Sequence, residues 1–269
     1  MSAVRFQGPQ EQRRSPEAAP GAASAWDSPS VWESGRPVER RLLDIQYRSV
    51  NALLVAYVSR LSRGEIFLEA AHGLPLGTRA LLRLQVPGTP PLKAEGVVSW
   101  SRPVALGPGM PAGAAIALAA SMEAQGAVID ELAARFRRIR MLVVSARAEM
   151  RAAVSRYLRS ILNCDITETA VPSPQRLAQV LDKELETGLD LVLVDLDDDP
   201  QHGRSLLPLV IRSVSRVAVP LIAFAQHERD RANAAGWGVT EVLGAPPLFS
   251  EMRDAVIHAL SSPASCTIT

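Results

Sequence analysis

The sequence predicts an α/β fold preceded by an all-β domain: a small antiparallel β-barrel over residues 36–120, then a doubly wound parallel sheet over residues 139–262. Two observations predict this. In the first region, short apolar runs are separated by turn chemistry with no helical segment between them. In the second, five strand-like runs alternate with amphipathic segments, which is typical of a parallel sheet covered on both faces.

Composition excludes several classes of protein. The chain has 269 residues, 47% of them apolar, so it can bury the cores of two modest domains. Its net charge of +1 gives no field that would recruit nucleic acid or an anionic membrane. Two cysteines, Cys164 and Cys266, do not make a disulfide scaffold and fit a reducing compartment. No apolar run is long enough for membrane insertion, and no secretory signal precedes the first domain, so we expect a cytoplasmic protein.

Both ends of the chain are expected to be tails. Residues 1–35 are rich in Pro, Ser, Ala and Gly and show no apolar period, which predicts disorder. Residues 263–269 follow the last expected helix and are interpreted as a short tail.

The first domain is expected to consist of strands. Alternating or β-branched runs occur at LLVAYVSRLS, EIFLEA, RALLRLQV, LKAEGVVSW and GAAIALA. Turn chemistry separates them at GLPLG, VPGTPP and RPVALGPGMPAG. Five strands at this spacing predict the small barrel.

A helix over residues 121–138 is expected to close the first domain and to link it to the second. Apolar residues recur there at helical spacing, and arginines gather at its C-terminal end, where they suit the helix dipole. The apolar positions are Val128, Ile129, Leu132, Ala133 and Phe136.

The second domain alternates strand and helix. The expected strands are MLVV, CDITETAV, LDLVLVDLD, VPLIAFA and EVLGAP, and an amphipathic segment follows each of them. Ser173 and Pro174 predict the start of the second of these helices. Sites in such sheets lie at the carboxyl ends of the strands.

This pattern resembles the receiver domain of two-component response regulators, which has a flavodoxin-like (βα)5 fold. The resemblance covers residues 139–262 and implies a phospho-accepting aspartate at the end of the third strand, where Asp195 stands. It also implies an acidic pair that binds Mg²⁺ after the first strand, a hydroxyl after the fourth and a lysine after the fifth. Asp195 is therefore the phospho-acceptor candidate.

The other receiver positions are degenerate. Ser145 and Ala146 replace the acidic pair, Ala225 replaces the hydroxyl, and Ala245 replaces the lysine before Pro246. One carboxylate coordinates Mg²⁺ poorly, and without the lysine the charge on a phosphoryl group is not neutralised. The residues therefore predict a pseudo-receiver. Residues 197–199 are three aspartates that we interpret as a solvated loop, with metal ligation as the alternative.

The first domain resembles a divergent PilZ domain. The resemblance rests on YRSV (residues 47–50), LSRGEIF, LPLGTRALLRLQVPG, GVVSW and PAGAAIAL, in that order. It implies a site for cyclic di-GMP built from an RxxxR motif and a [DN]xSxxG motif.

The two cyclic di-GMP motifs are preserved unequally. RxxxR is present as Arg36 and Arg40, and the second motif retains Ser62. Arg60 replaces its Asn or Asp, and Glu65 replaces its Gly, bringing a carboxylate to where phosphates would lie. We expect no binding of cyclic di-GMP.

No other chemistry is indicated. The four histidines have no metal-ligand spacing, and no nucleophile elbow or phosphate-binding loop occurs. The expected function is that of a non-enzymatic signalling adaptor that contacts other signalling proteins and needs no metal or cofactor. The alternative is a phosphorelay response regulator phosphorylated on Asp195 with Mg²⁺, or a cyclic di-GMP effector, or both. Partner identity, pathway and homo-oligomerisation stay open.

Overall fold

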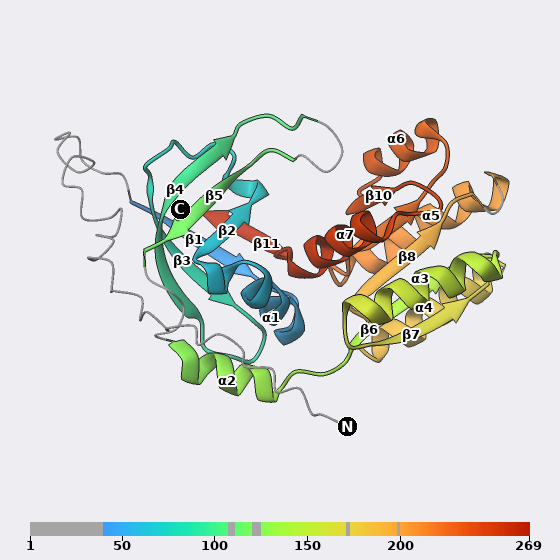
Figure 1. Cartoon of the computed structure of the whole chain (residues 1–269), viewed down its shortest axis with the longest axis horizontal. Coiled ribbons are helices and arrows are strands. Elements are labelled where there is room, and N and C mark those ends of the chain that lie inside the picture. Colours follow the sequence, from blue (N-terminus) through green and yellow to red (C-terminus); the bar gives the residue numbers. More distant parts are fainter. Residues whose placement is uncertain (1–39, 107–110, 120–124, 171–172, 198–199) are drawn as a thin grey trace, which may run out of the picture. The chain divides into compact units, whose positions relative to one another are not determined.

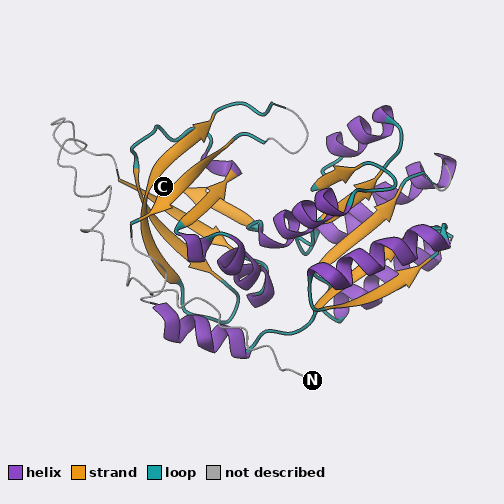
Figure 2. Cartoon of the chain, viewed as in Figure 1, coloured by secondary structure: helices purple, strands orange, loops and turns teal. Residues whose placement is uncertain are grey.

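The computed structural model describes residues 40–106, 111–119, 125–170, 173–197 and 200–269. This part of the chain forms a six-stranded sheet and a five-stranded sheet, together with the helices that pack on them (Figures 1 and 2). The expected N-terminal tail, residues 1–35, lies outside the described residues. Within the described ranges, no helix is both long enough and apolar enough to cross a lipid bilayer.

The six-stranded sheet has the order β11-β1-β3-β4-β5-β2. Its strands are β1 (Arg40–Gln46), β2 (Glu65–Leu68), β3 (Arg79–Gln85), β4 (Leu92–Arg102), β5 (Gly113–Leu118) and β11 (Ser265–Ile268). β1 and β3 pair in parallel and the other neighbours are antiparallel. The expectation of an all-antiparallel sheet was therefore wrong, and the reason lies in the segment between β1 and β3.

That segment contains helix α1 (Val50–Ser59), where the sequence analysis expected a strand. Ser49 caps the helix, because its Oγ accepts a hydrogen bond from the Ala52 backbone N at 3.2 Å. Leu53 and Leu54 pack into the core of the six-stranded sheet, whereas Val55 packs against the core of the other sheet. A helix covered on more than one side is apolar all round, so its 3.6-residue period is hidden in the sequence. The chain crosses over through α1, which allows β3 to return parallel to β1.

The C-terminal segment is the second difference. Residues 263–269 were expected to be a tail, yet Ser265–Ile268 forms strand β11 and pairs antiparallel with β1. Leu42 and Thr269 extend the pairing by exchanging two backbone hydrogen bonds. Cys266 and Ile268 pack against the core of the six-stranded sheet, and their burial stabilises the strand. The six-stranded sheet therefore includes a strand that follows the five-stranded sheet in the sequence.

The remaining elements of the first region are short. Helix α2 (Gly126–Ala134) lies within the expected linker helix and buries Ile129 and Leu132. Two single 3₁₀ turns, η2 (Leu61–Arg63) and η3 (Glu69–Ala71), flank β2.

The α/β unit, residues 139–261, contains the five-stranded sheet. Its strands are β6 (Ile139–Val144), β7 (Cys164–Thr169), β8 (Leu191–Asp195), β9 (Leu221–Phe224) and β10 (Glu241–Leu243). Its helices are α3 (Ala148–Ile161), α4 (Pro174–Glu186), α5 (Pro200–Ser215), α6 (Glu228–Gly236) and α7 (Phe249–Ser261). All strand pairs are parallel and the order is β10-β9-β8-β6-β7, the doubly wound flavodoxin-like arrangement. The expected alternation of five strands and five helices is confirmed for the described residues.

Two apolar clusters cover the two faces of this sheet. On β6, Met141 and Val143 belong to one core cluster, whereas Leu142 and Val144 belong to the other. Successive strand side chains point to opposite faces, so a strand buried on both faces is apolar throughout. α3 and α7 supply the first layer, and α4, α5 and α6 supply the second.

Candidate functional site

Asp195 is the last residue of β8, the central strand of the α/β unit. The strand run DLVLVD places it at the carboxyl edge of the sheet, where the sequence analysis expected a site. The residue is buried, with 2% of its surface exposed. A carboxylate at this depth must be compensated by partners that hold its charge.

Arg147 is the main partner of Asp195. Its Nη2 lies 2.7 Å from Oδ1 and 2.6 Å from Oδ2 of Asp195, and its Nε donates to Oδ2 at 3.0 Å. A planar guanidinium that engages both carboxylate oxygens forms one of the strongest ion pairs found in proteins. We call this pair the Arg147–Asp195 clamp.

Ser145 and Asp197 complete the site. Ser145 follows β6, is 1% exposed, and its Oγ donates to Oδ2 of Asp195 at 2.8 Å. The backbone N of Asp197 donates to Oδ1 of Asp195 at 3.2 Å. The Asp197 carboxylate accepts the backbone N–H of Gln226 at 2.8 and 2.9 Å, which ties the loop after β8 to the loop after β9. Both oxygens of Asp195 are thus occupied by donors from the chain itself.

The alanines expected at receiver positions lie at the same edge of the sheet. Asp195 is opposite Phe224 in the register, and Phe224 is opposite Leu243, so the ends of β8, β9 and β10 are adjacent. Ala225 directly follows Phe224, is fully buried, and donates its backbone N–H to Leu243. Ala245 follows β10 and packs partly against the core. Neither side chain can donate a hydrogen bond or carry a charge.

The residues present do not fit Mg²⁺. This ion prefers several oxygen ligands in near-octahedral geometry. Asp195 already gives its oxygens to Arg147 and Ser145, and Arg147 Nη2 also lies 3.8 Å from Asp197 Oδ2. Across the described residues, no group of three or more His, Cys, Asp or Glu side chains is arranged to hold a metal. Asp198 and Asp199, considered as extra ligands, lie outside the described residues.

Arg147 is the functional residue that sequence reasoning missed. It stands two positions after Ser145 in SARAEMR, at the start of α3. The available signal was electrostatic. A buried aspartate that has lost its metal-binding partners needs a cation, and the first basic residue after β6 is this arginine. Ala146, the other degenerate position, is exposed, and its carbonyl accepts from Arg151 Nη1 at 3.0 Å.

The candidate cyclic di-GMP residues are spread over different elements. Arg40 begins β1, is exposed, and lies opposite Arg79 of β3. Ser62 is exposed in η2, where its Oγ contacts the Val58 carbonyl at 3.5 Å. β1 and β2 are not neighbours in the sheet order, so strand pairing does not bring these residues together. Arg36 lies outside the described residues.

The degenerate positions of the second motif have a clear local role. Arg60 caps the C-terminus of α1, and Glu65 opens β2 opposite Ala117. The left-handed residue of this turn is Gly64, with φ of 76°. Glu65 is therefore ordinary extended backbone in β2, so having Glu where the motif has Gly costs no backbone strain. The Glu65 carboxylate is exposed, so the negative charge expected at this position is present.

Comparisons with known proteins find similarity to solved structures over 46% of the chain. No protein-family model matches the chain, and no curated protein matches it. The chain is similar to a solved pilus assembly-related protein from Burkholderia pseudomallei, with 22% identity and a TM-score of 0.38 over 46% of this chain and 90% of the other. It is also similar to the signal receiver domain of an HD domain-containing protein from Pseudomonas fluorescens, with 20% identity and a TM-score of 0.38 over 46% and 95%. The chemotaxis response regulator CheY4 of Vibrio cholerae shows 14% identity and a TM-score of 0.37 over 46% and 99%.

The strand order of the five-stranded sheet and the position of Asp195 identify the fold of the α/β unit. The α/β unit is a flavodoxin-like doubly wound domain with the buried carboxylate of Asp195 at the carboxyl end of its central strand.

Proposed function

We propose that this chain is a non-enzymatic signalling protein whose α/β unit is a receiver that takes no phosphate. The observation that carries the proposal is the Arg147–Asp195 clamp. Three donor contacts from one guanidinium and one from Ser145 occupy the carboxylate that would attack a phosphoryl donor. The guanidinium also neutralises the charge to which Mg²⁺ would bind.

The neighbouring positions support the same function. A phosphorylated receiver needs a group that reads the new charge, and Ala225 and Ala245 have none. The Asp197 carboxylate already joins the loops after β8 and β9 through the backbone N–H of Gln226, so no phosphoryl group is needed to hold these loops together. Signalling then depends on surface contacts with other signalling proteins rather than on phosphate.

Phosphotransfer is tested directly by intact-mass measurement of the full chain after incubation with acetyl phosphate and Mg²⁺. We expect no added phosphoryl group, because Asp195 has no free oxygen to attack with. A phosphorylatable receiver in the same mixture is the positive control, and the Asp195→Asn variant sets the baseline. A phosphoryl adduct on the natural chain that Asp195→Asn lacks would favour the alternative, a phosphorelay response regulator.

The signalling role is tested with the same variant. Proteins captured from the native host by the full chain and by Asp195→Asn should be the same set in the same amounts, since the contact surface does not depend on phosphate. Loss of partners in a folded Asp195→Asn variant would contradict the proposal even without detectable phosphate.

For the six-stranded sheet we propose a PilZ-like domain that does not bind cyclic di-GMP. The support is local: Glu65 presents an exposed carboxylate beside Arg60, and Arg40 lies on a strand that does not pair with β2. Isothermal titration of the full chain should show no one-site binding tighter than about 10 μM, a threshold of roughly −7 kcal/mol.

The matched variant for this titration is Arg60→Asn with Glu65→Gly, which restores the motif and removes the carboxylate. If the arginines of RxxxR are correctly placed, this variant should bind more tightly than the natural chain. Micromolar binding by the natural chain would overturn the proposal.

A further inference from the structure

A cavity of about 530 Å³ lies between the six-stranded sheet and residues 238–263 of the chain. The volume falls in the range of small-molecule sites, roughly 300–1,000 Å³. Its walls are largely apolar, and Ile66, Leu68 and Val239 contribute to them. An apolar cavity with a few converging polar groups is typical of a ligand site.

Tyr47 supplies the first of these polar groups. Tyr47 lines the cavity, and the residue is only 2% exposed. Its hydroxyl has no hydrogen-bond partner among the residues that the structure describes. Burial raises the pKa of Tyr47, and the nearby charge of Arg60 only partly opposes this rise. The hydroxyl therefore stays protonated at neutral pH and is a donor without an acceptor.

Arg60 supplies the second polar group. It caps α1 and lines the same cavity, where its charge acts on the Tyr47 hydroxyl. Its guanidinium forms no hydrogen bond or ion pair with any other residue of the described ranges. A half-buried cation and the hydroxyl of a buried tyrosine that line one cavity form a pair that is complementary to an anion.

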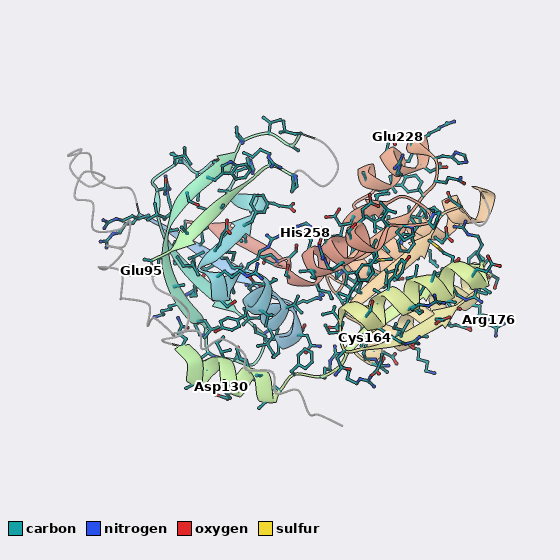
Figure 3. The ribbon with its side chains drawn as sticks, in the orientation of Figure 1. Glu95, Asp130, Cys164, Arg176, Glu228 and His258 are labelled. Carbon is teal, nitrogen blue, oxygen red and sulfur yellow. The ribbon has the colours of Figure 1, made fainter. Side chains whose placement is uncertain are left out.

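Two acidic groups near the cavity lie close to a histidine. His258, labelled in Figure 3, lies on α7 and its Nδ1 is 2.6 Å from Glu241 Oε1. Its Nε2 is 3.8 Å from Glu69 Oε1. Arg60 is the one lysine or arginine among the described lining residues, and two carboxylates lie close by, so the cavity can accept one negative charge but not a phosphate dianion.

We propose that this cavity binds a small carboxylate with an apolar body. The Tyr47 hydroxyl and the Arg60 guanidinium hold the carboxylate, and Ile66, Leu68 and Val239 enclose the apolar part. Both donors gain the acceptor that the described part of the protein does not provide. This site is independent of the Arg147–Asp195 clamp, and its failure would leave the proposed function unaffected.

The test is a titration of the full chain with benzoate, followed by saturation-transfer NMR. Benzamide has nearly the same shape without the charge, and we expect it to bind about tenfold more weakly or worse, as for loss of a hydrogen bond to a charged group. Tyr47→Phe removes one donor with almost no change in volume and should weaken benzoate binding severalfold. Arg60→Met should weaken it by about tenfold or more.

The matched control is Arg63→Met. Arg63 has the same charge three residues further along, but it is exposed and does not line the cavity. This variant should bind benzoate as the natural chain does. Thermal unfolding verifies that each variant is folded. If Arg60→Met does not fold, the Tyr47→Phe variant alone still tests the proposal. No saturable benzoate binding at about 10 mM, a free energy near −3 kcal/mol, or binding unchanged by Tyr47→Phe, overturns the proposal.

Discussion

At the scale of single residues, Arg147 is the residue that compensates the buried charge of Asp195. Arg147 is 43% exposed, whereas the Asp195 side chain is 1% exposed. The carboxylate therefore depends on the arginine far more than the arginine depends on the carboxylate. Removing one member of such a pair leaves either a buried charge without a partner or a surface charge that water can solvate.

We predict that Arg147→Met lowers the free energy of unfolding by about 3 kcal/mol, because it leaves the Asp195 carboxylate buried with Ser145 as its main remaining side-chain partner. Adding Asp195→Asn should recover most of this loss, since the buried charge is then gone. Urea unfolding of the single and double variants measures both effects.

Arg156→Met is the control for this cycle. Arg156 lies on the same helix, α3, and is exposed. Its replacement should change the free energy of unfolding by no more than about 0.5 kcal/mol. A loss in Arg147→Met as small as that in Arg156→Met would show that the clamp does not hold in solution.

Part of this site could be predicted from the sequence. Asp195 ends an uninterrupted apolar run, and such a run fixes both the strand and its carboxyl end. The clamp was not predicted, because periodicity along the chain identifies strands but not the partner of a buried charge; only the need of Asp195 for a cation pointed to Arg147. The motif match places its glycine at Glu65, whereas the left-handed residue of the turn is Gly64, because a motif match says nothing about φ.

At the scale of elements, strand β11 and helix α1 determine how the first sheet is built. β1 has β3 on one side and would be an edge strand without β11 on the other. Unpaired strand edges offer backbone donors and acceptors to other chains. β11 covers Leu43–Gln46, and Ile268 packs on the core beneath.

We predict that deletion of residues 265–269 lowers the free energy of unfolding by several kcal/mol, because it removes a strand and uncovers apolar core. It should also produce self-association through the exposed edge of β1. Urea unfolding and light scattering measure the two effects. Ile268→Ala, which keeps the backbone pairing, should destabilise the chain without self-association, and a truncated chain that stays monomeric and fully stable would contradict this role.

Sequence periodicity identified the elements of the α/β unit better than those of the first sheet. Helices α3 and α4 are amphipathic with one buried stripe, so their period is visible. α1 has buried residues around its circumference and was mistaken for a strand. β11 consists of four residues, SCTI, with a mixed burial pattern, and only its pairing with β1 identifies it.

At the scale of the whole molecule, a buried aspartate joins α1 to the α/β unit. Asp190, 1% exposed, accepts from Arg137 Nη1 at 2.9 Å and Nη2 at 3.1 Å, and from the backbone N of Arg140 at 2.9 Å. Asn51 of α1 donates to Asp190 Oδ2 at 3.5 Å and to the Arg137 carbonyl at 3.0 Å. Arg48 donates to the Asp190 carbonyl at 2.8 Å, and burial lowers its pKa to about 10, so it remains charged at neutral pH.

We predict that Arg137→Met lowers the free energy of unfolding by about 3 kcal/mol, since the buried carboxylate of Asp190 loses its only cation with a bidentate contact among the described residues. The control is Arg138→Met, one residue further along. Arg138 pairs with Asp165 at 2.8 Å, but both side chains are more than half exposed, so its loss should cost less than about 1 kcal/mol. Equal effects in the two variants by urea unfolding would contradict the central role of Asp190.

The position of β11 also affects how the protein matures during synthesis. β1 leaves the ribosome early, whereas the strand that covers its outer edge is made only after the entire α/β unit, a delay on the order of tens of seconds. During that interval the uncovered edge of β1, Leu43–Gln46, can pair with any extended segment nearby. The parallel strands β6–β10 also fold slowly, because their contacts join residues far apart in the sequence. Nascent chains released before residue 265 should therefore need chaperones to avoid aggregation, because the six-stranded sheet is complete only once β11 has been made.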